Sequence, residues 1–249
     1  MNLLRVENLS KRFGAFSALK NLSLTIPEKT IVLLIGPNGS GKTTLINCIS
    51  GVYRPESGKI WFKGVDITGE EPYKIVKLGI GRSFQTPGPF KKLTVGENLL
   101  VCSQNHKGEN ISTSIFKRIW DEHENALIQK LFKILKVVDL EAHCDALADE
   151  LSGGQLKLLE LGRLLMLNSK LMLLDEPVGG INPVLAYKIL SQIQKIRDNF
   201  GTSFFLVEHR LDLVMQYVDY VYCLAEGNII FKGSPKEVLE TKKLYDIFL

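Results

Sequence analysis

The segment Gly36-Pro37-Asn38-Gly39-Ser40-Gly41-Lys42-Thr43 decides the fold of this chain, because it matches the pattern G-x-x-x-x-G-K-[ST]. An apolar run at residues 30–35 precedes it, and a helical pattern follows at residues 42–50. The glycines let successive backbone N–H groups point inward, and the start of the helix adds positive potential. We therefore predict a phosphate-binding loop that holds a nucleoside triphosphate, rather than a glycine-rich turn that binds nothing.

Several side chains of this loop have expected roles toward the nucleotide. Lys42 would reach the β- and γ-phosphates, and the hydroxyl of Thr43 would ligate Mg²⁺. The neighbouring hydroxyl of Thr44 could reach a phosphate. The predicted nucleotide-binding residues of this segment are Gly36, Pro37, Asn38, Gly39, Ser40, Gly41, Lys42, Thr43 and Thr44.

A pair of acidic residues ends a second apolar strand. Residues 171–174 are apolar, and Asp175 and Glu176 follow them directly. Ligands of parallel α/β sheets bind at the carboxyl ends of the strands, which is where these two residues are expected. Asp175 is suited to hold Mg²⁺ through water, and Glu176 is a candidate to orient or deprotonate the attacking water. Two solvated acids at the end of a strand are the alternative, which the phosphate loop makes the weaker one.

The order of the segments predicts an α/β fold. Strand-like runs occur at residues 18–26, 30–35, 58–63, 171–174, 203–207 and 220–224. Helical patterns separate several of them, which implies parallel pairing. The run 18–26 alternates, as an antiparallel strand with one buried face does. From about residue 86 to 165 the helical period dominates. We predict one domain over residues 1–249, with a sheet core from 1–85 and 166–249 and a helical part at about 86–165.

Composition excludes several classes of protein. The 249 residues carry 31 Lys+Arg and 27 Asp+Glu, which gives a formal net charge of +4, and 45% are hydrophobic. These are globular proportions, and the small charge favours no nucleic acid as a partner. Apolar runs fall far short of the roughly 18 residues of a membrane span, and we expect no secretory signal. The four cysteines form no CxxC pair, which argues against a zinc site and fits a reducing cytosol.

A third motif, Leu151-Ser152-Gly153-Gly154-Gln155, opens a helix with a capping serine and two glycines, another start that can receive an anion. With this motif, the phosphate loop and the acidic pair, the sequence resembles the ATP-binding-cassette (ABC) ATPases over nearly the whole chain. The resemblance implies the P-loop NTPase fold of that family, with a mostly parallel sheet core, an antiparallel β subdomain and a helical subdomain. It also implies hydrolysis of ATP with Mg²⁺.

The resemblance assigns roles to further residues. Residues 152–155 would face the γ-phosphate held by the opposite subunit rather than by their own chain. Gln85 resembles the glutamine that contacts Mg²⁺ or the attacking water, and His209 resembles the switch histidine that contacts the γ-phosphate. Phe13 resembles the aromatic residue that stacks on adenine. Phe16 is a rival for that role, and a packing role in the core is an alternative for either ring.

Finer features resemble one branch of the family, the ATPase subunits of importers for branched-chain or other hydrophobic amino acids. The segments that carry this resemblance are residues 79–90, 93–100 and 179–183. Urea or amide importers and the lipopolysaccharide-export ATPase share much of the pattern, so the solute stays open. Asn182 stands where the family often has aspartate, which leaves the strength of coupling between subunits open.

The resemblance also implies partners and a location. One cassette supplies half of each ATP site, so a second ABC ATPase subunit is required, either an identical copy or a sister subunit. Membrane-spanning permease subunits would carry the solute, and an extracytoplasmic solute-binding protein would deliver it. The chain would be peripheral, at the cytoplasmic face of the cell membrane. One alternative is a soluble ABC ATPase without a transport role. The sequence does not support it, because DNA-repair versions need long coiled-coil heptads and ribosome-acting versions usually carry two cassettes, whereas this sequence shows no such heptads and one cassette. The other alternative is a P-loop switch or kinase, which residues 152–155 disfavour.

Overall fold

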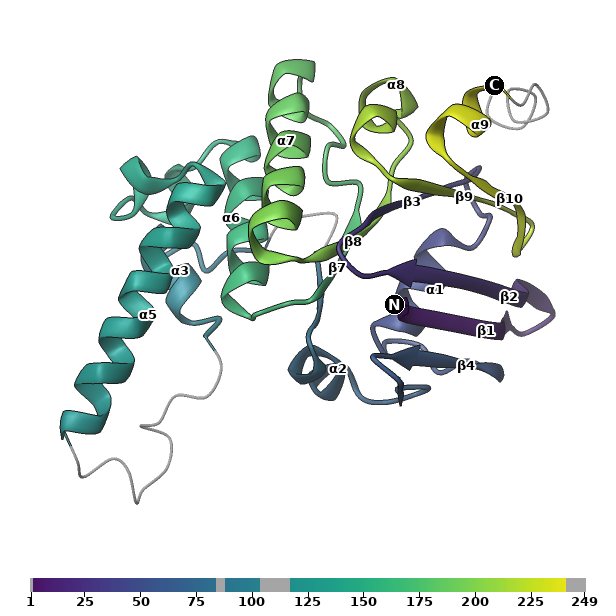
Figure 1. Cartoon of the computed structure of the whole chain (residues 1–249), viewed down its shortest axis with the longest axis horizontal. Helices are drawn as coiled ribbons and strands as arrows, with labels where there is room; N and C mark the ends of the chain where they lie inside the picture. The colour runs from purple at the N-terminus through teal and green to yellow at the C-terminus, as the bar shows by residue number, and fades with distance from the viewer. Residues whose placement is uncertain (1, 84–87, 104–116, 241–249) are drawn as a thin grey trace. The chain divides into compact units, whose positions relative to one another are not determined.

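The computed structural model describes residues 2–83, 88–103 and 117–240 (Figure 1). The chain divides into two compact units. The first unit combines residues 1–85 with residues 170–249, and the second consists of residues 86–169. The first unit contains the β-sheets, and the second is helical.

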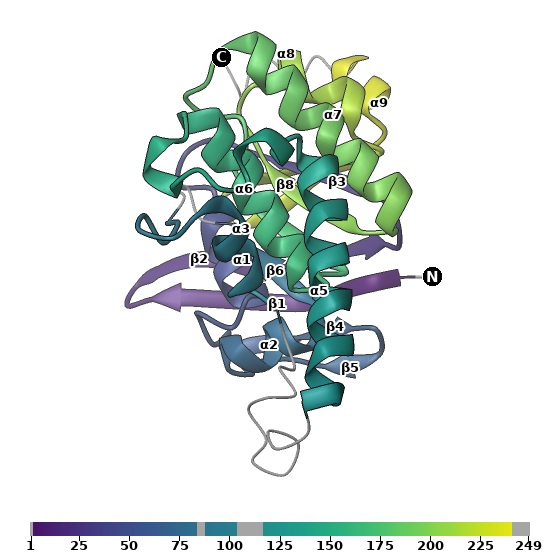
Figure 2. The same cartoon turned by 90° about the vertical axis from the view of Figure 1, so that its left-hand side faces the viewer.

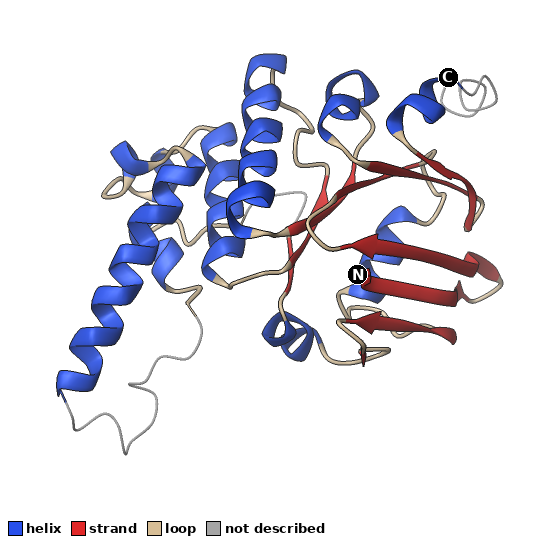
Figure 3. Ribbon diagram, viewed as in Figure 1, coloured by secondary structure: helices blue, strands red, loops and turns tan. Residues whose placement is uncertain are grey.

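The described residues of the first unit form two β-sheets (Figure 3). The larger sheet has the strand order β10-β9-β3-β8-β7-β6, in which only β10 pairs antiparallel. The smaller sheet is antiparallel, in the order β2-β1-β4-β5. The strands are β1 (Asn2–Phe13), β2 (Phe16–Pro27), β3 (Ile31–Ile35), β4 (Ser57–Phe62), β5 (Val65–Asp66), β6 (Ile80–Arg82), β7 (Leu171–Asp175), β8 (Ser203–Val207), β9 (Tyr220–Ala225) and β10 (Asn228–Gly233). This arrangement confirms the predicted α/β fold class, with a mostly parallel sheet and an antiparallel β part.

The helices of the first unit begin and end at residues suited to the purpose. The side chain of Asn182 accepts a hydrogen bond from the backbone N–H of Leu185 at 2.9 Å, Pro183 takes the first helical position, and Gly201 ends the helix at a φ of 63°. The hydroxyl of Ser234 accepts a hydrogen bond from the N–H of Glu237 at 3.4 Å and so caps the helix at residues 235–240. These helices are α1 (Lys42–Ile49), α2 (Pro72–Leu78), α7 (Pro183–Phe200), α8 (Leu211–Val214), η4 (Met215–Tyr217) and α9 (Pro235–Glu240).

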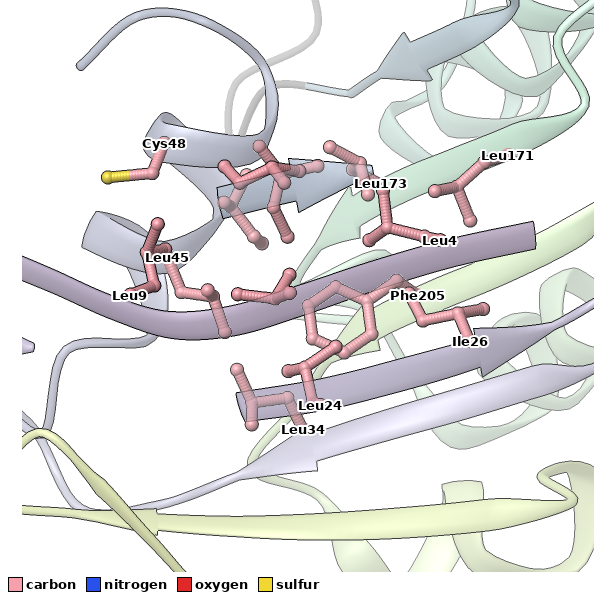
Figure 4. Packing of buried hydrophobic residues seen from close by; sticks show 14 of the residues in the cluster. Leu4, Leu9, Leu24, Ile26, Leu34, Leu45, Cys48, Leu171, Leu173 and Phe205 are labelled. Carbon is pink, nitrogen blue, oxygen red and sulfur yellow. The ribbon is translucent and has the colours of Figure 1, made fainter. Parts of the chain in front are cut away.

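The core of the first unit lies between its two sheets. Figure 4 shows apolar side chains from β1, β2, β3, β7, β8 and α1 pointing toward one another. Every residue of β3 and of β7 is buried, which explains why both strands are apolar without alternation. Because the helix α1 contributes Leu45 and Cys48 to the same cluster, the loop between β3 and α1 is anchored at both ends. This anchoring fixes the position of the glycine-rich segment.

The described residues of the second unit form three α-helices that lie side by side (Figure 2). They are α3 (Val95–Leu100), α5 (Lys117–Val138) and α6 (Gly153–Met166), with the short turns η2 (Glu141–His143) and η3 (Ala148–Glu150) between the last two. Gly162 lets them approach, because a Cβ there would lie 2.9 Å from a methyl group of Leu99 and 3.5 Å from one of Ile134. No helix among the described residues of the chain has the length and apolar character needed to cross a membrane.

Candidate active site

The glycines of the phosphate loop are required by close approach and by backbone geometry. A Cβ at Gly36 would lie 2.2 Å from the carbonyl oxygen of Leu224, which no side chain could tolerate. Gly41 has a φ of 110°, and a Cβ there would lie 2.5 Å from the carbonyl oxygen of Ala18. The helix α1 starts directly after Gly41. The loop is therefore held tightly against β2 and β9, with the first N–H groups of α1 at its end.

Lys42 folds back over the loop. Its Nζ donates hydrogen bonds to the carbonyl oxygens of Gly36 at 2.7 Å and of Pro37 at 2.9 Å. Burial lowers the pKa of Lys42, against the opposing effect of the carboxylates of Asp175 and Glu176. Its ammonium group thus lies among acceptors of the loop and close to two acidic groups. A phosphate oxygen could replace the carbonyl oxygens as an acceptor.

A cavity of about 340 Å³ opens beside this loop. It is lined by Phe13, Phe16, Ala18, Asn38, Gly39, Gly41, Lys42, Thr43, Thr44, Asp175, Glu176, Val207 and His209. The cavity thus brings together residues that are far apart in the sequence, including both acids and the histidine. Gly36 and Pro37 contribute carbonyl oxygens to Lys42 without lining the cavity, and Ser40 is buried beneath it. The sequence did not single out Ala18 or Val207, which are small apolar residues without a motif.

Asp175 is a buried carboxyl group at the end of β7. It is 3% exposed, and its backbone N–H donates to the hydroxyl of Ser83 at 3.3 Å. Burial raises the pKa of Asp175, and Arg82 opposes this effect because its guanidinium group favours the ionised carboxylate. Arg82 was not identified from the sequence, since only the pairing of β6 with β7 brings it near. The site therefore holds an acidic group that is poorly solvated and suited to a cation.

Glu176 has an unusual backbone conformation. Its φ is 52°, in the left-handed region that non-glycine residues seldom occupy. The N–H of Glu176 donates to the carbonyl oxygen of Val207 at 2.9 Å, and its own carbonyl oxygen accepts from Gly179 at 3.0 Å. These bonds turn the chain sharply after β7 and direct the side chain toward His209, whose Nε2 lies 3.3 Å from Glu176 Oε1. Such conformations cluster at functional sites.

The helix α6 of the second unit has an accessible start. The hydroxyl of Ser152 accepts from the N–H of Gln155 at 3.4 Å, and the side chain of Gln155 accepts from the N–H of Ser152 at 2.8 Å. The side-chain Nε2 of Gln155 also lies 2.9 Å from His143 Nε2, a contact that the sequence did not suggest. Ser152 and Gly153 are exposed, while Gly154 is buried. Gln85, which was predicted to contact Mg²⁺ or water, lies outside the described residues.

The fold and the cavity define a P-loop nucleotide-binding protein, and comparison with known proteins gives its family. A family model described as ABC transporter matches residues 19–179. The chain is 44% identical over 249 residues to a probable branched-chain amino acid transport ATP-binding protein of Archaeoglobus fulgidus, covering 100% of this chain and 96% of the relative. It is 42% identical over 253 residues to a protein of the same description from Methanocaldococcus jannaschii, covering 100% and 98%.

A solved structure shows the same fold. The ADP conformation of an ATP-binding cassette of an ABC transporter is 40% identical to this chain and superposes with a TM-score of 0.86, covering 100% of this chain and 98% of that one. The chain belongs to the ABC transporter family. This confirms the predicted fold and the prediction of an ATP-binding, ATP-hydrolysing subunit.

Proposed function

We propose that this chain hydrolyses ATP with Mg²⁺ to power the import of branched-chain amino acids through a membrane transporter. The observation that carries the proposal is that Lys42, Asp175, Glu176 and His209 line the same cavity. A P-loop alone would fit many nucleotide-binding proteins. The two acidic residues and the histidine at the ends of neighbouring strands add the groups that hydrolysis needs.

The residues present fit a magnesium–nucleotide complex. Mg²⁺ prefers oxygen ligands, and the hydroxyl of Thr43 and the carboxyl of Asp175 both line the cavity. A cation would also offset the burial that disfavours the charged form of Asp175. When bound, Mg²⁺ neutralises charge that develops on the phosphates. Lys42 and the N–H groups at the start of α1 would bind the phosphates, and Phe13 would stack on adenine, with Phe16 as its rival.

Glu176 and His209 would position the attacking water and the γ-phosphate. Glu176 is the candidate to orient or deprotonate the water, because a carboxylate is a suitable acceptor of its proton. His209 is the candidate to contact the γ-phosphate, and its Nε2 is within 3.3 Å of Glu176. We assign the additional contact with Mg²⁺ or water to Gln85, on the resemblance of its sequence context.

The exposed start of α6 would complete the ATP site of a second subunit. Ser152 and Gly153 are exposed there, and a helix start with free N–H groups attracts anions. We assign residues 152–155 to the γ-phosphate bound by the opposite subunit, so that two cassettes form a dimer around ATP. The second cassette is an identical copy or a sister subunit.

The descriptions of the relatives support the choice of solute. The proteins of A. fulgidus and M. jannaschii are both described as branched-chain amino acid transport ATP-binding proteins. These descriptions favour branched-chain amino acids over urea, amides or lipopolysaccharide. The partners would be permease subunits in the membrane and an extracytoplasmic solute-binding protein, with this chain at the cytoplasmic face.

A transport assay tests the proposal. The complex would be purified through this chain and reconstituted in lipid vesicles with its solute-binding protein, and uptake of labelled leucine would be measured with ATP supplied on the side of the ATPase subunit. We expect uptake that requires ATP and that stops in the Lys42→Ala complex. ATP-dependent uptake of urea without uptake of leucine, isoleucine or valine would contradict the assigned solute.

A further inference from the structure

A buried carboxyl group lies directly beside the candidate switch histidine. Glu208 separates the end of β8 from His209 and is 1% exposed. Its Oε1 accepts a hydrogen bond from the backbone N–H of Val178 at 2.7 Å, and its Oε2 accepts one from the N–H of His209 at 3.3 Å. A buried carboxyl group is costly unless it is hydrogen-bonded, so these contacts explain how the site tolerates it. Glu208 does not line the cavity.

The bond to Val178 ties together the two segments that carry the candidate chemistry. Val178 lies in the turn that follows Glu176 and is fully buried. The same turn is closed by the bond from the N–H of Gly179 to the carbonyl oxygen of Glu176. Glu208 therefore connects the loop of His209 to the turn of Glu176 through two backbone hydrogen bonds. The side chains of Glu176 and His209 lie 3.3 Å apart in the cavity.

The backbone of Glu176 needs such support. A non-glycine residue at a φ of 52° persists only where the surrounding structure determines it strongly. One hydrogen bond, from Glu176 N–H to Val207, holds the start of the turn. The hydrogen bond from the N–H of Val178 to Glu208 holds the part of the turn that follows Glu176. Without it, the buried N–H of Val178 would lose the acceptor that Glu208 supplies, and the turn could relax.

We propose that Glu208 is a positioning residue that sets the relative placement of Glu176 and His209 by holding the N–H of Val178. The inference rests on the proposed function, because it assumes that Glu176 and His209 act on ATP. The required property is an acceptor oxygen within hydrogen-bond distance of the N–H of Val178. Charge by itself is not required, since Glu208 does not line the cavity.

Two conservative variants separate reach from charge. Glu208→Gln keeps the length and an oxygen that can accept from Val178, while its amide nitrogen replaces the oxygen that accepts the longer bond from the N–H of His209. Glu208→Asp keeps the acid but is shorter by one methylene group, which withdraws the oxygen from the N–H. We expect kcat for MgATP hydrolysis to fall by about tenfold or more in Glu208→Asp and to stay within about threefold of the wild type in Glu208→Gln, because small misplacements of catalytic groups are costly.

Binding and stability measurements distinguish positioning from a general structural role. The affinity for ATP, measured by equilibrium binding of a fluorescent ATP analogue, should be unchanged in both variants, and so should KM. Asp212→Ala is the matched control, because it removes an exposed carboxylate four residues away. It should leave kcat unaltered. Thermal unfolding of each variant establishes that the chain is folded.

The outcomes separate this inference from the proposed function. A wild type that hydrolyses ATP, a Lys42→Ala variant that does not, and a Glu208→Asp variant with wild-type kcat would overturn the inference alone. A folded Glu208→Gln variant that is as impaired as Glu208→Asp would also overturn it, since holding the N–H of Val178 would then not be enough to place the two residues. A reconstituted wild-type complex without ATP hydrolysis would overturn the proposed function and this inference with it.

Discussion

His209 Nε2 lies 3.3 Å from Glu176 Oε1, although 32 other residues separate them in the sequence. The pairing of β7 with β8 brings them together, because Asp175 and Val207 are partners in register at the ends of these parallel strands. Glu176 comes directly after β7, His209 comes two residues after the end of β8, and both line the cavity. A carboxylate and an imidazole at this distance can both hydrogen-bond to one water molecule that lies beside them. We therefore propose that the two residues act together on the attacking water.

Replacing Lys42 should abolish hydrolysis. Lys42→Ala removes the ammonium group that would contact the β- and γ-phosphates, and hydrogen bonds to charged groups contribute about 1.5–3 kcal/mol each. ATP binding should weaken by roughly tenfold or more on that scale. Phosphate release and equilibrium nucleotide binding measure the two effects. Lys59→Ala, which removes an exposed lysine paired with Asp66, is the control and should behave as the wild type. Hydrolysis within a few-fold of wild type in Lys42→Ala would refute the assignment of the phosphate loop.

Removing the charge of Asp175 should stabilise the nucleotide-free protein while impairing hydrolysis. Burial raises the pKa of Asp175 above its usual value of 3.8, so the folded protein disfavours the ionised form. Below pH 3.8 this carboxyl is neutral in both the folded and the unfolded chain, so the stability that its neutral form allows is fully present. As the pH rises through the raised pKa, the free energy of unfolding loses this contribution. Asp175→Asn should therefore raise the thermal midpoint at pH 7, with a smaller difference near pH 4.5.

Asp66 provides a control of opposite sign. Hydrogen bonds from Lys59 and Thr68 lower the pKa of Asp66 from 3.8 to about 2. The ionised carboxylate therefore stabilises the folded state at pH values above 3.8, and this stabilisation is lost as the pH falls through the lowered pKa. Asp66→Asn should lower the thermal midpoint at pH 7, and this difference should shrink as the pH falls toward 2. If Asp175→Asn also lowers the midpoint at pH 7 without nucleotide, the burial argument for Asp175 is wrong.

Phe13 should contribute more to ATP binding than Phe16. Both rings line the cavity, but Phe13 is fixed edge-on against Tyr53 at a centroid distance of 5.3 Å, while Phe16 is 60% exposed. A ring that is already ordered loses less entropy when a base stacks on it. Phe13→Ala should weaken ATP binding by about 1–3 kcal/mol, the range for stacking of a base on an aromatic side chain.

Binding of inorganic tripolyphosphate separates stacking from indirect damage. It has no base, so Phe13→Ala should bind it as the wild type does. A larger loss of ATP affinity in Phe16→Ala than in Phe13→Ala would assign the stacking role to Phe16 instead.

Local patterns in the sequence predicted much of the fold and most of the cavity. The apolar run of β3, the glycines after it and the acids after β7 all carry their information within a few residues. Ser152 marks a helix start in the same local way. The strand β6 was not predicted, because three residues are too few to form a pattern.

Contacts between distant segments could not be predicted. Arg82 acts on Asp175 only because β6 pairs with β7, and Glu208 reaches Val178 only because β7 pairs with β8. Nothing in the residues around Glu208 indicates a buried acid, since an acidic residue at the end of a strand is usually solvated. The sequence can therefore name the groups that would touch the nucleotide more readily than those that hold them in place.

Removing the basicity of Glu176 separates nucleotide binding from chemistry. Glu176→Gln keeps the size and most hydrogen-bonding capacity of the side chain but cannot take a proton from water. Contacts of ATP with the phosphate loop, Lys42 and Thr43 should persist. Because ATP would remain intact between two subunits, the ATP-bound dimer should accumulate. Size-exclusion chromatography with light scattering, with the sister subunit added if one co-purifies, should show this dimer at saturating ATP and mainly monomer without nucleotide.

The turnover of MgATP by Glu176→Gln at saturating nucleotide tests the central claim most directly. ATP occupancy of the variant, measured in the same samples, should equal that of the wild type. The predicted result is a fall in turnover by roughly 10² or more, the scale expected for loss of a positioned base. Turnover within a few-fold of wild type at equal occupancy would contradict the account, because the carboxylate at Glu176 would then have no part in activating water.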